Sequence, residues 1–196
     1  MALHFSKEEF KNRKLKVLKS MKEQNLNALL MFKQESMYWL TGYDTFGFVF
    51  FQSLILRDDG EIILLTRAPD LRQAQNTSNI KDIRIWVDKD GSNPTEDLKI
   101  ILNELSLNGK TIGIEYEAYG LTGRNAIKLN QSLEGYCEIK DKSELVSNLR
   151  VIKSIEEISY VRKAAELADR ALDEVWKNAK EGVNAVSYTH LRAHET

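Results

Sequence analysis

The stretch LRVIKSIEEISYVRKAAELAD, residues 149–169, decides how the fold of this chain is divided. Ser154 can cap a helix, and Glu157 three positions later completes a capping box. Apolar residues then recur at spacings of three and four, at Ile158, Val161, Ala165, Ala168, Leu172 and Val175. A helix with such a face packs it against a partner. We therefore expect this helix to open a second segment, after an α/β pattern that is already complete.

The composition is that of an ordinary globular protein. Hydrophobic residues make up 42% of the 196 residues and charged residues 29%, which disfavours disorder. The formal net charge of -1 gives no support for nucleic-acid binding. No apolar run approaches the ~20 residues of a membrane span, and the opening MALHFSKEEF lacks the apolar core of a signal peptide. We expect a cytoplasmic protein that binds neither nucleic acid nor membrane.

Strand and helix signals alternate before residue 149. Ser6 and Glu9 form a capping box, which predicts a helix to about Glu23 whose apolar stripe contains Phe10, Leu15, Leu18 and Met21. A strand is predicted at 27–32, then a short helical turn that ends at Gly42. Two further strands are predicted at 46–56 and 61–66, joined by a hairpin turn with Gly60.

The rest of this part continues the alternation. A helix is predicted from about residue 69 to 75, strands at 83–87, 111–116 and 136–139, and helices at 94–105 and 121–133. The pattern predicts an α/β fold with a mixed β-sheet flanked by helices.

Three segments of the chain are similar to one known family. They are WLTGYDTFGFVFFQ at 39–52, KTIGIEYEAYGL at 110–121, and the boundary run with Arg150, Lys153, Ser154, Glu157, Ile158, Arg162 and Ala165. The chain resembles the N-terminal domain of the creatinase and aminopeptidase P family, the pita-bread metallohydrolases. The resemblance implies a ribonuclease-H-like mixed sheet, followed by the first helix of a pita-bread domain that the chain does not contain. We expect the N-terminal domain at 1–148, a linker and first catalytic-domain helix at 149–185, and a non-native tail at 186–196.

The resemblance implies a parent enzyme that is a homodimeric, metal-dependent hydrolase. Such an enzyme cleaves a C–N bond in a peptide or a small amide-type metabolite, with a pair of divalent metals (Mn, Co or Zn) held by two Asp, one His and two Glu. None of these ligands can be assigned in this chain, so we expect no catalytic residue, no bound metal and no activity of the chain alone. The Xaa-Pro peptidases commonly have Ser-Asn-Ile before Tyr-Leu-Thr-Gly, whereas Glu35, Ser36 and Trp39 stand here. This departure brings the chain closer to ectoine-hydrolase-like members. A stand-alone binding or dimerisation module is the alternative from another class.

The resemblance also indicates which segment lies near a substrate. In the family, the part that corresponds to residues 39–48 reaches toward the active site of the partner subunit. Tyr43 and Asp44 lie in a turn, where we expect an exposed polar pair that contributes to substrate binding. Phe46 and Phe48, two apart on a predicted strand, face one side and can line an apolar pocket. Packing against the strand's neighbours is the alternative explanation for these two phenylalanines.

Other polar residues have a functional and a structural explanation. Arg67 follows a strand and could bind a substrate carboxylate, or form a surface salt bridge with Asp70. Glu115 and Glu117 flank a tyrosine on a predicted strand and point to the same side as a carboxylate pair, or they form a strand-end or interface feature. Cys137 has no nearby histidine, which favours a buried structural thiol.

The last ten residues contain a tempting metal pattern. His190 and His194 are four apart, and a helix would place both on one face, as in a zinc-binding pair. The composition changes abruptly here, and the segment SYTHLRAHET is typical of a translated sequencing adapter. We exclude it from the fold and expect no metal site in it. For the tryptophans, we expect Trp39 and Trp86 in the core and Trp176 exposed.

Overall fold

The computed structural model describes residues 3–179 and residue 181. It divides into two compact units, Met1–Ile152 and Lys153–Thr196. Within the described residues, no helix is both long enough and apolar enough to cross a membrane.

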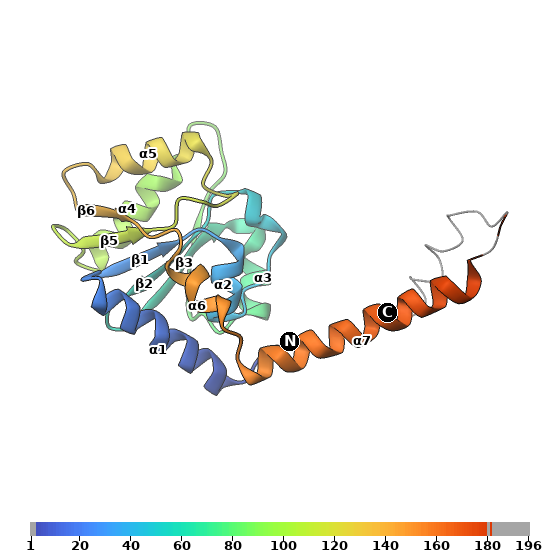
Figure 1. Ribbon diagram of the computed structural model, residues 1–196. Coiled ribbons are helices and arrows are strands. Elements are labelled where there is room, and N and C mark those ends of the chain that lie inside the picture. Colours follow the sequence, from blue (N-terminus) through green and yellow to red (C-terminus); the bar gives the residue numbers. More distant parts are fainter. Residues whose placement is uncertain (1–2, 180, 182–196) are drawn as a thin grey trace. The chain divides into compact units, whose positions relative to one another are not determined.

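The first unit is built on one six-stranded mixed sheet with the order β4-β3-β2-β1-β5-β6 (Figure 1). The strands are β1 (Ala28–Met31), β2 (Ser53–Arg57), β3 (Ile62–Arg67), β4 (Asp82–Trp86), β5 (Thr111–Ile114) and β6 (Glu138–Asp141). β2 pairs antiparallel with both β1 and β3. The other pairs, β3 with β4, β1 with β5, and β5 with β6, are parallel. The carboxyl ends of β1, β5 and β6 therefore meet at one edge of the sheet.

Helices cover both faces of the sheet. The helices are α1 (Lys7–Glu23), α2 (Gln34–Thr41), α3 (Leu71–Thr77), α4 (Pro94–Glu104), α5 (Gly123–Leu133) and α6 (Leu145–Val151), with 3-10 turns η1 (Phe46–Val49) and η2 (Ala68–Asp70). In Figure 1, α4 and α5 lie on one side of the sheet, and α1, α2 and α6 on the other. The predicted mixed sheet flanked by helices is confirmed.

Alternate side chains of the central strand enter two separate cores. Leu30 belongs to the core under α4 and α5, whereas Leu29 and Met31 belong to the core under α1, α2 and α6. All four residues of β1 are buried, since a central strand covered on both faces presents no side chain to solvent. Trp39 and Trp86 are 5% and 6% exposed, as predicted.

Local signals place several element ends where the sequence predicts them. The Ser6 hydroxyl accepts a hydrogen bond from the Glu9 N–H at the start of α1, which ends at Glu23. Gly42 ends α2 in the left-handed conformation with φ 82°, and Gly60 has φ 91° in the hairpin turn between β2 and β3. Both positions favour glycine because a Cβ atom is strained there.

The predicted strand at 46–56 is wrong in its first half. Residues Phe46–Val49 form η1, and β2 begins only at Ser53. The Thr45 side chain accepts a hydrogen bond from the Gly47 N–H and so closes a tight turn where the sequence had indicated extended backbone. The stripe predicted for α1 also needs correction, because Leu15 is 52% exposed while Arg13 is buried.

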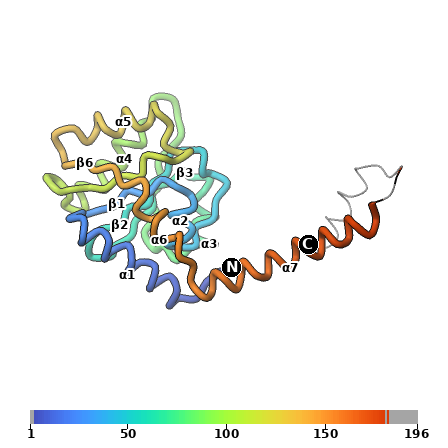
Figure 2. The backbone as a smooth tube through the Cα atoms, in the orientation of Figure 1, coloured from blue at the N-terminus to red at the C-terminus, as the bar shows by residue number. Residues whose placement is uncertain are grey.

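The second unit contains one helix, α7 (Ile155–Asn178), within its described residues. The capping box of Ser154 and Glu157 is formed in both directions, as the sequence predicts. Trp176 is 72% exposed, as predicted. The predicted boundary at 148/149 falls inside α6, which the sequence analysis did not identify, and the division at 1–148, 149–185 and 186–196 stays a prediction. Figure 2 traces the backbone of the first unit from α1 to α6.

Candidate functional site

Tyr43 is buried rather than exposed, which corrects the expectation of an exposed polar pair. Its exposed fraction is 0%, and its hydroxyl donates a hydrogen bond to Gln52 Oε1 at 2.8 Å. Burial raises the pKa of the phenol above its usual range. Asp44 next to it is exposed, as predicted. Tyr43 therefore anchors the segment, and Asp44 is the member of the pair that solvent can reach.

A buried carboxylate fixes the turn that follows. Asp70 Oδ2 lies 3.2 Å from Arg67 Nε, and Asp70 Oδ1 accepts a 3.4 Å hydrogen bond from the Thr45 hydroxyl. The Arg67 guanidinium also lies 3.4 Å from the centre of the Phe50 ring, a cation–π contact. Of the two explanations for Arg67, the structure contains the salt bridge with Asp70. Arg67 thus holds the segment in place.

Gly47 allows this turn to approach Asp70 closely. A Cβ atom at residue 47 would lie 2.6 Å from both carboxylate oxygens of Asp70. Only glycine therefore fits without displacement of the carboxylate or the turn.

Phe46 and Phe48 do not line one face of a strand. They lie in η1, where Phe46 is 88% exposed and Phe48 is 37% exposed. The Phe48 ring packs edge to face on Tyr119, with ring centres 6.0 Å apart. A Cβ at Gly120 would come within 2.5 Å of the Phe50 carbonyl oxygen, so the loop after β5 lies directly against this segment. Phe48 therefore lines a pocket together with the loop after β5, and Phe46 points to solvent.

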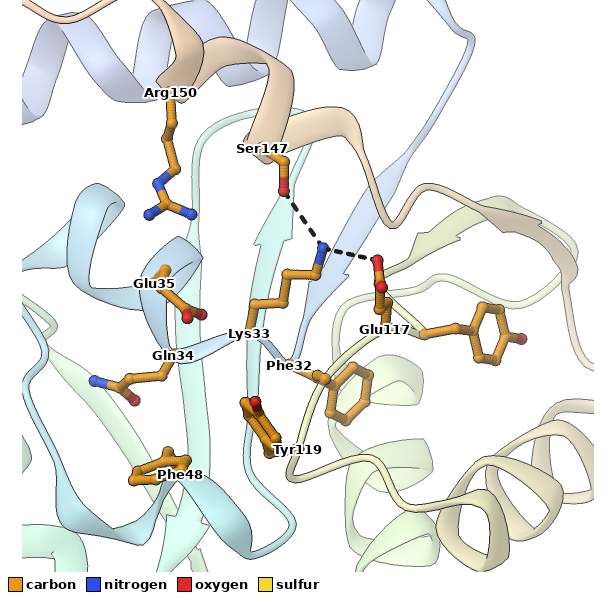
Figure 3. A pocket seen from close by; sticks show the side chains of 11 residues that line it. Phe32, Lys33, Gln34, Glu35, Phe48, Glu117, Tyr119, Ser147 and Arg150 are labelled. Carbon is orange, nitrogen blue, oxygen red and sulfur yellow. Dashed lines mark hydrogen bonds and ion pairs between the residues drawn. The ribbon is translucent and has the colours of Figure 1, made fainter.

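The pocket beside Phe48 is a hollow of about 980 Å³ at the carboxyl ends of β1 and β5 (Figure 3). Its aromatic lining consists of Phe32, Phe48, Tyr116 and Tyr119. Its charged lining consists of Lys33, Glu35, Glu117 and Arg150, the last from α6. Ligands of α/β proteins commonly bind beyond the carboxyl ends of strands. We define this set of residues as the strand-end hollow.

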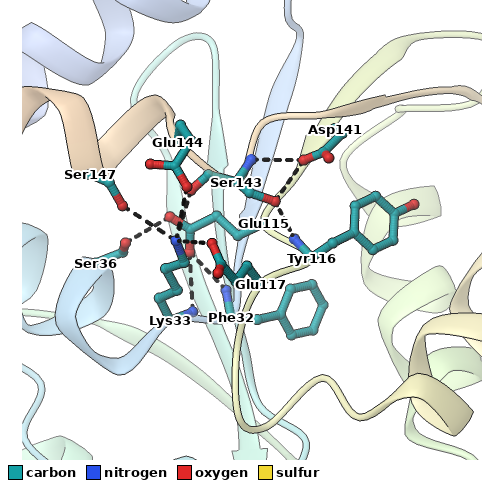
Figure 4. Close-up of polar contacts among 10 residues, drawn as sticks. All are labelled: Phe32, Lys33, Ser36, Glu115, Tyr116, Glu117, Asp141, Ser143, Glu144 and Ser147. Atoms are coloured by element: carbon teal, nitrogen blue, oxygen red, sulfur yellow. Dashed lines mark hydrogen bonds and ion pairs between the residues drawn. The ribbon is translucent and has the colours of Figure 1, made fainter.

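A buried acid, Glu115, is hydrogen-bonded to the backbone of two residues that line the strand-end hollow (Figure 4). It is 0% exposed, and its Oε2 accepts hydrogen bonds from the backbone N–H groups of Phe32 and Lys33, each at 3.1 Å. Its Oε1 accepts a 2.7 Å bond from the Ser36 hydroxyl. Burial raises the pKa of Glu115 to about 7, and these hydrogen bonds oppose the rise. Glu115 ties the end of β1 and the start of α2 to the end of β5.

The Lys33 side chain is the centre of a polar network next to Glu115. Its Nζ donates to the Ser143 carbonyl at 3.1 Å and to the Ser147 hydroxyl at 3.4 Å. It also lies 3.6 Å from Glu117 and 3.7 Å from Glu144. The predicted same-side pair of Glu115 and Glu117 is wrong, because β5 ends at Ile114 and the Glu117 side chain is 78% exposed. The strand-end alternative is confirmed for Glu115.

The described residues do not provide a metal site. Among them, no three His, Cys, Asp or Glu side chains come together in a way that could hold an ion. The metal pair implied by the family resemblance therefore does not fit the described part of the chain. Cys137 is partly buried against the core, and burial raises the pKa of its thiol. His190 and His194 lie outside the described residues.

The sequence analysis did not identify Glu115 as a buried support, nor Lys33 and Arg150 as neighbours of Phe48. One signal was available: Lys33 directly follows an apolar strand, where polar residues at a strand end often meet those of the next parallel strand.

The family of the chain follows from comparison with known proteins. The family described as Creatinase/Prolidase N-terminal domain matches residues 13–152. The chain belongs to the creatinase/prolidase family, and these residues are its N-terminal domain.

Individual relatives agree with this assignment. The chain is 30% identical to an uncharacterized hydrolase/peptidase, y4tM, of Sinorhizobium fredii, over 92% of this chain and 48% of that protein. It is 28% identical to the ectoine hydrolase of Halomonas elongata, over 85% of this chain and 43% of that protein. The solved prolidase of Thermococcus sibiricus has the same fold, with a TM-score of 0.76 and 20% identity over 95% of this chain and 49% of that one. The chain spans about half the length of the curated relatives it matches.

Proposed function

We propose that the chain acts as the substrate-selecting and dimer-forming N-terminal domain of a metal-dependent hydrolase, which cleaves a C–N bond in a peptide or a small amide-type metabolite. The observation that carries this proposal is the match of residues 13–152 to the creatinase/prolidase N-terminal domain. The relatives named hydrolase/peptidase and ectoine hydrolase support the reaction class.

In this proposal, the catalytic centre lies outside the chain. A pair of Mn, Co or Zn ions, held by the other half of the parent enzyme, would activate water and polarise the scissile carbonyl. The contribution of this chain is to bind, orient and select. The chain by itself is then inactive.

The segment 43–50 is the part of the chain to which we assign substrate selection. The hydrogen bond of Tyr43 to Gln52 and the ion pair of Arg67 with Asp70 fix the position of this segment. Its Asp44 and Phe46 are exposed to solvent. A segment with a fixed backbone that exposes a carboxylate and an aromatic ring can bind and orient a substrate. The reaction itself would then be performed by another part of the protein. In the proposed homodimer, these residues would face the catalytic cleft of the second subunit.

The second candidate substrate class is a small amide-type metabolite rather than an Xaa-Pro peptide. It is favoured by the ectoine hydrolase relative and by Glu35, Ser36 and Trp39 at positions where the peptidases have other residues. The same segment would then select a compact substrate.

The test joins this chain to the catalytic half of the Sinorhizobium relative and measures hydrolysis of Xaa-Pro dipeptides and of ectoine. We expect activity that requires divalent metal, and Asp44→Asn and Phe46→Ala should change the ratio of kcat/KM between substrates at unchanged metal content. A joined protein that binds metal normally but hydrolyses neither class would contradict the hydrolase and favour a stand-alone module. Turnover of Xaa-Pro dipeptides by the 196-residue chain alone would contradict the placement of the catalytic centre.

A further inference from the structure

Two side chains of the strand-end hollow carry opposite charges and have no counter-ion in the described part of the chain. Arg150 reaches the hollow from α6, and Glu35 reaches it from the first turn of α2 (Figure 3). Neither makes a hydrogen bond or an ion pair with another described residue. Both charges are therefore available to a ligand in the hollow.

The other two charges of the lining already have partners. The Lys33 ammonium lies 3.6 Å from the Glu117 carboxylate and 3.7 Å from the Glu144 carboxylate. Two cations and two anions line the hollow, so their formal charges cancel. An anionic ligand would meet Glu35 and Glu117, and a cationic ligand would meet Arg150 and Lys33. A ligand that carries one charge of each sign avoids both penalties.

The remaining side of the hollow is apolar. Phe48 and Tyr119 form an edge-to-face pair there, and their rings are 37% and 79% exposed. Because the two rings pack on each other, their side chains lose little conformational entropy when an apolar side chain of a ligand packs on them. The volume of about 980 Å³ exceeds what one small molecule needs, so a compact ligand fits without movement of the backbone.

We propose that the strand-end hollow is a binding site for a free α-amino acid with an apolar or aromatic side chain. Its carboxylate pairs with the planar guanidinium of Arg150, its ammonium pairs with Glu35, and its side chain packs on Phe48 and Tyr119. The inference goes beyond the proposed function, because it concerns binding by this chain and requires no hydrolysis.

The test is a titration of the purified 196-residue chain with L-phenylalanine. Binding is measured by isothermal titration calorimetry and by NMR chemical-shift changes. We expect saturable binding, with affinity at least about tenfold weaker for N-acetyl-L-phenylalanine, which lacks the ammonium, and for L-phenylalaninamide, which lacks the carboxylate. Arg150→Gln and Glu35→Gln should each weaken L-phenylalanine binding by a similar factor. Arg124→Gln and Glu134→Gln, which remove exposed charges outside the hollow, should leave the affinity unchanged.

The two ligand derivatives keep the proposal falsifiable even where a variant folds poorly. Absence of saturable binding to the unaltered chain would overturn the proposal. Equal affinity for the amino acid and for both derivatives would do the same, because the paired charges would then contribute nothing. These outcomes are independent of the substrate ratios of the joined enzyme.

Discussion

The Glu115 carboxylate accepts a 2.7 Å hydrogen bond from the Ser36 hydroxyl, although the two residues lie 79 positions apart in the chain. The same carboxylate accepts the backbone N–H groups of Phe32 and Lys33. One acid thereby satisfies three donors at the point where β1 passes into α2. The geometry of the strand-end hollow depends on this buried group, because Phe32 and Lys33 are both part of its lining.

Titration of Glu115 should make stability depend on pH. Burial raises its pKa in the folded chain to about 7 from an ordinary value of 4.5, so the folded state binds this proton more tightly than the unfolded state. The resulting contribution to the free energy of unfolding is complete below about pH 4.5 and is lost as the pH rises through 7, a change of roughly 3 kcal/mol. Glu115→Gln cannot titrate. Urea denaturation at a series of pH values should show the free energy of unfolding of the wild type falling relative to that of this variant as the pH rises from about 4.5 to 8.

The matched control is Glu117→Gln, since the Glu117 side chain is 78% exposed. Its free energy of unfolding should follow that of the wild type across the same pH range. A gap between wild type and Glu115→Gln that stays constant from pH 4.5 to 8 would contradict the assignment.

Gly47→Ala should destabilise the fold. The new methyl group would lie 2.6 Å from the carboxylate oxygens of Asp70, so either the turn or the ion pair of Asp70 with Arg67 must shift. Overpacking of this kind costs about 1–3 kcal/mol. Gly123→Ala is the control, because nothing lies within 4 Å of a Cβ there and the residue begins α5. Chemical denaturation should separate the two variants, and equal stabilities would refute the steric argument.

Local sequence signals predicted the frame of the fold well. The N-cap at Ser6, the capping box at Ser154, the left-handed glycine after α2 and the hairpin glycine each act within a few residues, so the sequence contains their full cause. The turn at Phe46–Val49 was missed because aromatic and branched residues favour a strand, whereas the Thr45 side chain and the approach to Asp70 favour a tight turn.

Less of the candidate site could be predicted from the sequence, because its residues come together from distant parts of the chain. The Tyr43 hydroxyl is hydrogen-bonded to Gln52, in the loop before β2, and lies 3.4 Å from the Thr66 hydroxyl on β3, and no periodic pattern in the sequence predicts these contacts. The strand-end hollow brings together the ends of β1 and β5 with α6, and α6 was not identified at all. For Phe48 the sequence left an apolar pocket and packing within a strand as two explanations, and Arg150 was noted only as part of the family resemblance.

Tyr43→Phe should act on stability, whereas Asp44→Asn should not. Removal of the Tyr43 hydroxyl takes away the 2.8 Å hydrogen bond to the buried Gln52 side chain, which costs about 1 kcal/mol or more. Asp44 is exposed, and its substitution should change the free energy of unfolding by no more than about 0.5 kcal/mol. Thermal and chemical denaturation of both variants test this. If Asp44→Asn is the more damaging substitution, the assignment of Tyr43 as anchor is wrong.

Arg13 should be the most sensitive charged position of α1, because it is one of the residues that this helix buries. The residues that α1 buries are Phe10, Arg13, Val17 and Met21, a regular helical spacing in which an arginine takes an apolar place. Its Nε lies 2.8 Å from Glu9, its Nη1 donates to the Trp39 carbonyl at 2.9 Å, and its guanidinium lies 4.0 Å from the centre of the Phe5 ring.

Arg13→Lys keeps the charge but replaces the planar guanidinium with a single ammonium, which cannot meet Glu9 and the Trp39 carbonyl in the same geometry while stacking on Phe5. Because the side chain is 2% exposed, water cannot replace the lost contacts, and we expect a loss of about 2 kcal/mol or more in the free energy of unfolding. Lys11→Met removes the exposed 3.8 Å pair of Lys11 with Glu8 on the same helix and should cost no more than about 0.5 kcal/mol. If urea denaturation gives the two variants the same midpoint, the prediction is wrong. Arg13 would then contribute no more to the free energy of unfolding than an exposed residue does.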